Sequence, residues 1–190
     1  MKFPESDLAH HLLDGSDTII EIGASAHNPF NIKCNKYFNV DLPKEYRQVY
    51  ETESATMGEG IAEVHIEACG NKLPFDDNSI DGVLSSHVIE HFYNPLSALN
   101  EWYRVLKPGG YMFIICPHVD RTFDRGRDIT TIDEIIERQT HTHPEDGAKH
   151  YTVWRTQDFI DFVTHFGFMV THYQDVDDKV GNGFTVVIQK

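Results

Sequence analysis

Strand-like apolar runs alternate with segments of helical spacing along this chain of 190 residues, and this alternation restricts the fold more than any other feature. The run Thr18–Ile22 reads TIIEI and is rich in β-branched residues, as expected for a strand covered on both faces. Alternating strands and helices are typical of βαβ units in a mostly parallel sheet. We predict an α/β fold with seven strands, at residues 18–22, 37–40, 62–68, 80–85, 111–116, 168–174 and 184–189.

Two helices are well marked between these strands. Asn94 is a suitable N-cap and Pro95 suits the first helical position. Apolar residues then recur at helical spacing, at Leu96, Leu99, Tyr103 and Leu106. The Pro-Gly-Gly segment at 108–110 should end this helix and turn the chain into the next strand. A second helix is expected over about 156–165, with one apolar face formed by Phe159, Phe162 and Val163.

The stretch between these parts, residues 117–155, is charged and irregular. Thr131 and Glu134 form a capping-box pattern there, which predicts one short helix. We interpret this stretch as a loop and helix insertion that forms the substrate side of a single domain spanning residues 1–190.

The composition restricts the partners. Lys and Arg number 16 against 30 Asp and Glu, so the formal net charge is −14. Binding to nucleic acid or to anionic membranes relies on Lys and Arg, so this balance argues against both. The three cysteines are widely spaced, at Cys34, Cys69 and Cys116. Their number and spacing predict neither a disulfide framework nor a CxxC zinc site.

No segment predicts contact with a membrane. The longest apolar run, residues 111–116, is too short to span a bilayer. The first residues, MKFPESDLAH, lack the apolar core of a signal peptide. We therefore expect a cytoplasmic protein without membrane insertion, and we leave a homodimer open.

Two residues point to a ligand at the ends of the first two strands. Gly23 directly follows a buried strand, where a glycine lets a ligand approach the backbone closely. Asp41 ends the next strand, 20 residues after Glu21, which is about the offset at which nucleotide-binding α/β folds place an acid against ribose hydroxyls. A tight turn at Gly23 and a strand-end cap at Asp41 are the plain structural alternatives.

The most specific signal lies in the middle of the chain. Residues 73–91 read LPFDDNSIDGVLSSHVIEH, and residues 101–110 read EWYRVLKPGG. Together with Glu21, Gly23 and Asp41, these segments resemble the class I S-adenosylmethionine-dependent methyltransferases. The resemblance is to the ubiquinone/menaquinone-type branch (methyltransferase type 11), and it covers roughly residues 18–118. It implies a Rossmann-like sheet of strand order 3-2-1-4-5-7-6, with the last strand antiparallel and helices on both faces.

The resemblance also implies a role for individual residues. Glu21 and Gly23 match the motif that holds the methionine part of the cofactor S-adenosyl-L-methionine, which leaves as S-adenosyl-L-homocysteine. Asp41 matches the acid that binds both ribose hydroxyls. The segment at 69–71 borders adenine. The full set of implied cofactor-binding residues is Glu21, Gly23, Ala24, Ser25, Asp41, Leu42, Cys69, Gly70, Asn71, Ser85, Ser86 and His87.

The sequence departs from the family pattern at two places. Ser25 and His27 stand where the family usually has further glycines, so they leave less room or supply new hydrogen bonds to the cofactor carboxylate. Cys69 stands where an adenine-binding Asp is common, and a thiol is a poor acceptor for an amino group. Glu67 or a backbone carbonyl is an alternative acceptor. The alternatives are weaker cofactor binding and compensation by these other groups, and the sequence leaves both open.

The insertion should hold the methyl acceptor. His118 begins it, after the fifth strand, and is our candidate for the base that removes the acceptor proton. Asp120 is its orienter or an alternative base, and His150 is the second catalytic candidate. Tyr151 and Trp154 are expected as pocket walls. The alternative for each histidine is an exposed or hydrogen-bonded structural role.

The sequence contains possible metal ligands but predicts no metal site. His118, Asp120, His141, His143 and His150 are suitable ligand types, but their spacing matches no compact metal motif. Residues 87–91 also match the HxxEH pattern of inverted zinc proteases. That pattern needs a long helix, whereas here it directly follows a strand, so a zinc hydrolase is only a remote alternative.

The sequence therefore predicts a methyltransferase for a small-molecule or sugar-type acceptor, methylated on oxygen or nitrogen. The charged loop resembles that of methyltransferases that accompany glycan assembly, which is why a sugar or glycan is included. The alternative is a binding module of the same fold without catalysis, which Ser25, His27 and Cys69 favour. The negative charge disfavours nucleic-acid acceptors, and a protein acceptor stays open.

Overall fold

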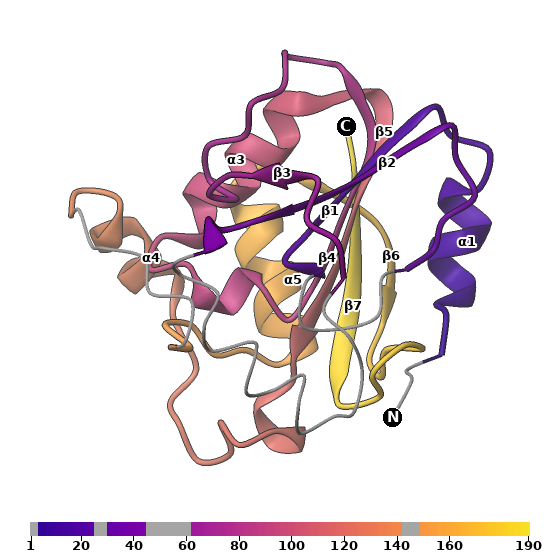
Figure 1. Ribbon diagram of the computed structural model, residues 1–190. Helices are drawn as coiled ribbons and strands as arrows, with labels where there is room; N and C mark the ends of the chain where they lie inside the picture. The colour runs from indigo at the N-terminus through magenta and orange to yellow at the C-terminus, as the bar shows by residue number, and fades with distance from the viewer. Residues whose placement is uncertain (1–3, 25–29, 45–61, 142–148) are drawn as a thin grey trace.

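The computed structural model describes residues 4–24, 30–44, 62–141 and 149–190. Its centre is a seven-stranded sheet of order β3-β2-β1-β4-β5-β7-β6 (Figure 1). The strands are β1 (Thr18–Ile22), β2 (Lys36–Asp41), β3 (Ile66–Glu67), β4 (Ile80–Ser86), β5 (Leu106–Pro117), β6 (Met169–Gln174) and β7 (Gly183–Gln189). Across the sheet, the neighbouring strands β3, β2, β1, β4 and β5 are parallel to one another, and β7 is antiparallel to both β5 and β6. The predicted fold class and strand order are confirmed.

Two strands differ from their predicted bounds by more than one residue at an end. The alternating run at 62–68 yields only the two-residue strand β3, which pairs with the end of β2. Strand β5 begins at Leu106 and includes the Pro-Gly-Gly segment that we expected to form a turn. Gly109 takes a φ of +84°, which glycine adopts without strain, and its N–H donates to the Lys190 carbonyl at 2.6 Å. The segment is thus held as an irregular part of the sheet, with a shift in register opposite β4.

Helices cover both faces of the sheet (Figure 1). Helices α3 (Pro95–Val105), α4 (Ile132–Arg138) and α5 (Thr156–His165) pack on one face, and α1 (Asp7–Leu13) packs on the other. The sequence marked all of them except α1. The Asn94 cap is confirmed, because its side chain accepts from the Ser97 N–H, and so is the capping box of Thr131 and Glu134.

The carboxyl ends of β1, β2, β4 and β5 lie along one edge of the sheet, because these strands are parallel. Two 3-10 helices follow directly, η3 (Ile89–His91) after β4 and η4 (Val119–Arg121) after β5. Described parts of the stretch 117–155 return to this edge, where the Tyr151 N–H donates to the Glu90 carbonyl at 2.8 Å and His118 forms a bridge with Trp154. Ligands of open α/β sheets bind at such an edge.

Among the residues that the structure describes, no helix has both the length and the apolar character needed to cross a membrane.

Candidate functional site

The turn after β1 is built around Gly23. Its N–H donates to the Val40 carbonyl at 2.9 Å, and its φ of +74° lies in the left-handed region that side chains disfavour. A Cβ at this position would stand 2.5 Å from Cγ2 of Val88, which follows β4. Both conditions require glycine, because the side chain of Val88 fills the space that a Cβ would take.

Asp41 lies beside this turn at the end of β2 and is buried. Its Oδ1 accepts from the N–H of Leu42 at 2.7 Å, and its carbonyl accepts from the Ala68 N–H at 2.8 Å. The chain then reaches residues 69–71, where the Gly70 carbonyl accepts from Nε1 of Trp102 at 2.7 Å. Asp41 and the segment 69–71, to which the resemblance assigns ribose and adenine, therefore lie next to each other at the edge of the sheet.

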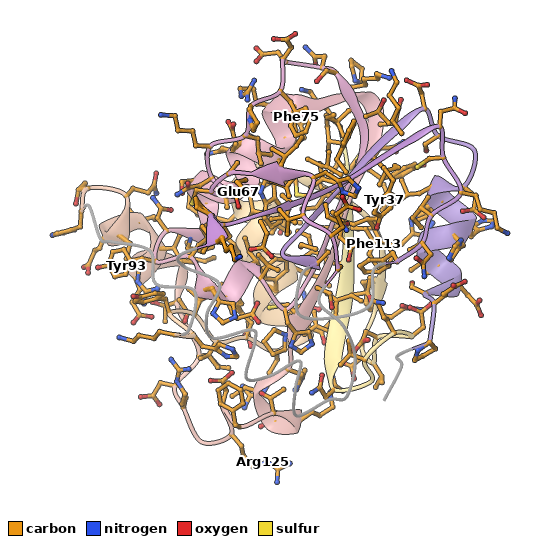
Figure 2. All side chains as sticks on the ribbon, in the orientation of Figure 1. Tyr37, Glu67, Phe75, Tyr93, Phe113 and Arg125 are labelled. Atoms are coloured by element: carbon orange, nitrogen blue, oxygen red, sulfur yellow. The ribbon has the colours of Figure 1, made fainter. Side chains whose placement is uncertain are left out.

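Glu21 is fully enclosed rather than exposed on the edge. Its Oε2 accepts from the Phe30 N–H at 3.0 Å and from the Tyr37 hydroxyl. Burial raises the pKa of this carboxyl to about 7, against the opposing effect of these hydrogen bonds and of the Lys179 ammonium. The side chain of Tyr37, which comes from β2, is labelled in Figure 2. Glu21 thus joins β1 to the chain around residue 30 and acts on a ligand only through the backbone that it holds.

The end of β4 supplies two serines to the same edge. The hydroxyls of Ser85 and Ser86 are buried, and neither has a hydrogen-bond partner among the described residues. His87 follows with a φ of +55° and Ala24 is buried after Gly23. The hydroxyls of Ser85 and Ser86 and the carboxylate of Asp41 supply polar groups that fit a nucleoside carrying an amino-acid tail.

Three predicted residues fall outside the described ranges. Ser25 and His27, the two departures from the glycine pattern, and His143 of the metal hypothesis belong to these ranges. Cys69, the remaining departure from the family pattern, is half-buried and packs against the apolar core. Glu67, its suggested substitute, accepts from the Lys44 N–H through Oε1 at 3.3 Å.

His118 caps the short helix that follows β5. Its Nδ1 accepts from the Asp120 N–H at 3.2 Å, and burial lowers the pKa of the imidazole. The Asp120 carboxylate does not orient it by a hydrogen bond, because Oδ2 lies 4.0 Å from Nδ1 and instead accepts from Nε of Arg155 at 3.0 Å. The lone pair that a base would use is therefore engaged in a backbone cap.

His150 is more deeply placed than a surface-loop histidine. Its Nδ1 lies 2.6 Å from Oδ2 of Asp124, whose other oxygen pairs with Arg127. Asp124 is 2% exposed, although acids in charged loops are usually solvated and its local sequence carries no signal of a site. Nearby on the same loop, Arg125 points away from the molecule (Figure 2).

The two residues expected as pocket walls, Tyr151 and Trp154, differ in their surroundings. Trp154 is fully buried in the main core, where its ring stacks on Phe162 with centroids 5.9 Å apart. Its assignment as a pocket wall is therefore wrong, and the physical reason is that α5 presents an aromatic face for it to cover. Tyr151 is 8% exposed and meets Tyr93 edge to face at 5.7 Å.

Within the described residues, the five-residue metal hypothesis is not assembled. His141 is exposed, with Nδ1 3.0 Å from the Glu137 carbonyl. The group of potential ligands that does come together is Glu90, His91 and His150. The HxxEH pattern also lacks its helix, because Ile89–His91 forms a three-residue 3-10 turn.

Comparison with known proteins agrees with this geometry. A family model described as a methyltransferase domain matches residues 21–114. The chain is 29% identical over 115 residues to a demethylmenaquinone methyltransferase of Protochlamydia amoebophila, covering 60% of this chain and 47% of that protein. It is 29% identical over 107 residues to a malonyl-[acyl-carrier protein] O-methyltransferase of Marinomonas sp., covering 53% and 38%. The chain belongs to the class I S-adenosylmethionine-dependent methyltransferases, in the type 11 branch.

Solved structures show the same fold. A SAM-dependent methyltransferase from Methanosarcina mazei superposes with a TM-score of 0.60 at 20% identity, covering 97% of each chain. Another, from Aquifex aeolicus, gives 0.56 at 20% identity and covers 93% of this chain and 83% of its own. The chain spans about half or less of the length of the curated relatives just named.

The match of the family model ends before the acceptor side. It stops at residue 114, so Asp124 and His150 of this methyltransferase lie beyond it. Glu90 lies inside the matched segment but its carboxylate faces histidines from both sides of that boundary. We call the predicted cofactor-binding residues, which lie inside the match, the cofactor half of the candidate site, and Glu90, Asp124 and His150 its acceptor half.

Proposed function

We propose that this chain transfers a methyl group from S-adenosylmethionine to an oxygen or nitrogen of a small-molecule acceptor. The observation that carries the proposal is the convergence of Gly23, Asp41 and the two buried serine hydroxyls at one edge of the sheet. Next to them, a buried cluster of acids and histidines lines the side where an acceptor would enter. The family membership supports the reaction, and the cluster supports a polar acceptor.

The chemistry is a displacement at carbon. When bound, the cofactor supplies an electrophilic methyl on its sulfonium. The acceptor lone pair forms the new bond to that carbon, the carbon–sulfur bond breaks, and the acceptor loses its proton to a base or to solvent. The chain contributes chiefly positioning: the ends of β1 and β4 hold the amino-acid part, and Asp41 accepts from the ribose hydroxyls.

Cofactor binding is the first test. Calorimetric titration with S-adenosylmethionine or S-adenosylhomocysteine should show one site per chain, and Asp41→Ala should weaken it at least about 10-fold, because a pair of charge-assisted hydrogen bonds is lost. Asp76→Ala, at an exposed position, is the matched control and should bind like the wild type. Binding of neither ligand to the wild type would overturn the proposal.

The acceptor class is tested with a panel. The names of two relatives suggest a quinol-type hydroxyl and an acyl-chain carboxylate, and the resemblance of the loop adds a sugar hydroxyl. Transfer of a labelled methyl group to one class, and not to the others, assigns the acceptor. Cofactor binding without transfer to these acceptors or to protein would instead support the alternative of a binding module.

A catalytic role of His118 can be tested separately from its role as the cap of the short helix. His118→Asn removes the imidazole but keeps a good capping acceptor for the Asp120 N–H. Because the Nδ1 lone pair is occupied in the structure, we expect kcat to stay within a few-fold of the wild type. A loss of about 100-fold or more at unchanged stability would assign His118 as the base after all.

A further inference from the structure

Glu90 is a buried acid whose carboxylate lacks a hydrogen-bond donor among the other described residues. It lies on η3, its side chain is 0% exposed, and neither carboxylate oxygen accepts a hydrogen bond from any described residue. Three imidazoles surround its Oε1: Nε2 of His91 and Nε2 of His150 at 3.8 Å, and Nδ1 of His87 at 4.0 Å. Burying a carboxylate in this way is costly unless something compensates it.

Two of these imidazoles are held in the tautomer that a metal requires. Nδ1 of His150 is 2.6 Å from Oδ2 of Asp124, and Nδ1 of His91 is 3.1 Å from the carbonyl of Lys149. A carboxylate and a carbonyl only accept, so each Nδ1 carries the hydrogen and each Nε2 keeps its lone pair. Both lone-pair nitrogens face the same oxygen of Glu90. In metal sites, the hydrogen bond that the other ring nitrogen donates usually orients a histidine ligand toward the metal.

The spacing suits one cation between the three groups. One ligand atom each from Glu90, His91 and His150 lies within 4.8 Å of the others. Tetrahedral ligands about 2.05 Å from zinc stand about 3.4 Å apart. The two 3.8 Å separations from Glu90 must therefore shorten by about 0.4 Å, and the separation of the two imidazole nitrogens, which is within 4.8 Å, by up to about 1.4 Å. Two histidines and one carboxylate are a ligand set for Zn²⁺ or Fe²⁺ that leaves a coordination position open.

We propose that Glu90, His91 and His150 form a binding site for a divalent transition-metal ion, with Asp124 and the Lys149 carbonyl as positioning groups. The evidence lies in the orphaned buried carboxylate and the two preset imidazoles, and it does not depend on methyl transfer. The site lies beyond the end of β4, beside the proposed acceptor side. If the proposed function holds, the open position would bind the acceptor oxygen and favour its deprotonated form.

The direct test uses tag-free protein stripped with a chelator and dialysed. Titration with Zn²⁺ should show one site of high affinity, and elemental analysis should find about one metal per chain. Glu90→Gln, which changes the size little, and His150→Ala should each weaken this site at least about 10-fold. His172→Ala removes an exposed histidine of β6 and is the matched control. No stoichiometric metal, or equal binding by all variants, would overturn the proposal.

Folding and coordination are checked separately. Glu90→Gln should still bind S-adenosylhomocysteine like the wild type, which shows that loss of metal is not loss of fold. Co²⁺ should give the visible absorption of a four- or five-coordinate site in the wild type and only that of a hydrated ion in Glu90→Gln. A hydrated-ion spectrum in both would count against the site even if surface histidines take up zinc.

The two proposals fail in different ways. Absence of cofactor binding with intact zinc binding would overturn methyl transfer and leave the metal site standing. Cofactor binding without stoichiometric zinc would do the reverse. Methyl transfer that survives complete removal of bound metal would refute only the role of the ion at the acceptor oxygen.

Discussion

Two buried glutamates, Glu21 on the cofactor half of the site and Glu90 on the acceptor half, meet very different surroundings. Glu21 accepts from the Phe30 N–H and the Tyr37 hydroxyl, and Lys179 lies close enough to favour its charge. Glu90 has no hydrogen-bond donor among the described residues and faces imidazole nitrogens instead. Burial raises the pKa of both carboxyls, to about 7 and about 8.

The difference separates a structural acid from a ligand-binding one. Satisfied hydrogen bonds fix Glu21 in place and leave it little capacity for another partner. Glu90 keeps both oxygens available in a place that water scarcely reaches, a state that a fold retains at a cost in stability. Such unsatisfied groups are enriched where a ligand completes the structure.

The largest expected effect is at the turn that opens the cofactor half. Gly23→Ala combines a left-handed φ with a Cβ 2.5 Å from Val88, so we expect a loss of about 2–5 kcal/mol in unfolding free energy and weaker cofactor binding. Gly15→Ala has a φ of +88° but nothing within 4 Å, so it should lose only about 1–2 kcal/mol. Urea denaturation measures both, and equal losses would show that the contact with Val88 is unimportant.

The second effect is the pH dependence that Glu21 imposes. Its pKa is higher in the folded protein, about 7, than the ordinary 4.5, so the folded state holds the proton more tightly. The stability contributed by this group is therefore full below pH 4.5 and falls as the pH rises through 7, by up to about 3 kcal/mol. Glu21→Gln should remove this fall, measured by denaturation at pH 5 and pH 8. Parallel profiles for wild type and variant would contradict it, and Glu137→Gln, at an exposed position, is the control.

The third effect distinguishes the two glutamates by their response to zinc. A ligand at 100 times its dissociation constant stabilises the folded state by about 2.7 kcal/mol. Zinc should therefore raise the melting temperature of the wild type and of Glu21→Gln by roughly 5–10 °C, and leave Glu90→Gln unchanged. Thermal denaturation with and without zinc measures this, and an equal rise in all three proteins would refute the distinction.

The smallest effect compares two acids on the acceptor loop. Asp124 is 2% exposed and bonded to His150 and Arg127, so Asp124→Asn should cost about 1–3 kcal/mol. Asp120 is half exposed and pairs with Arg155 in solvent, so Asp120→Asn should cost less than about 1 kcal/mol, and less still at high salt. Denaturation at two salt concentrations checks the pair. Equal costs would mean that burial does not distinguish them.

The cofactor half could be predicted from the sequence because its signals are local. A buried strand followed by Gly23, and Asp41 at the end of the next strand, depend on short segments whose place at the sheet edge follows from βαβ connectivity. Most helix ends followed for the same reason, whereas the strand order followed from the family resemblance. The exceptions were β3, α1 and the start of β5, where pairing with distant residues such as Lys190 decided the conformation.

By itself, the sequence determined the alternation of strands and helices and most of their bounds, because periodicity and caps act over a few residues. The family and the strand order followed from the resemblance of its motifs. Only the tertiary structure decided which polar groups meet. Glu90 and His150 are 60 residues apart, and Asp124 and His150 are 26 apart. Packing of the loop against the end of β4 brings them together, and it also directs Trp154 into the core. Spacing along a chain carries no record of such contacts, because they depend on how separate elements pack.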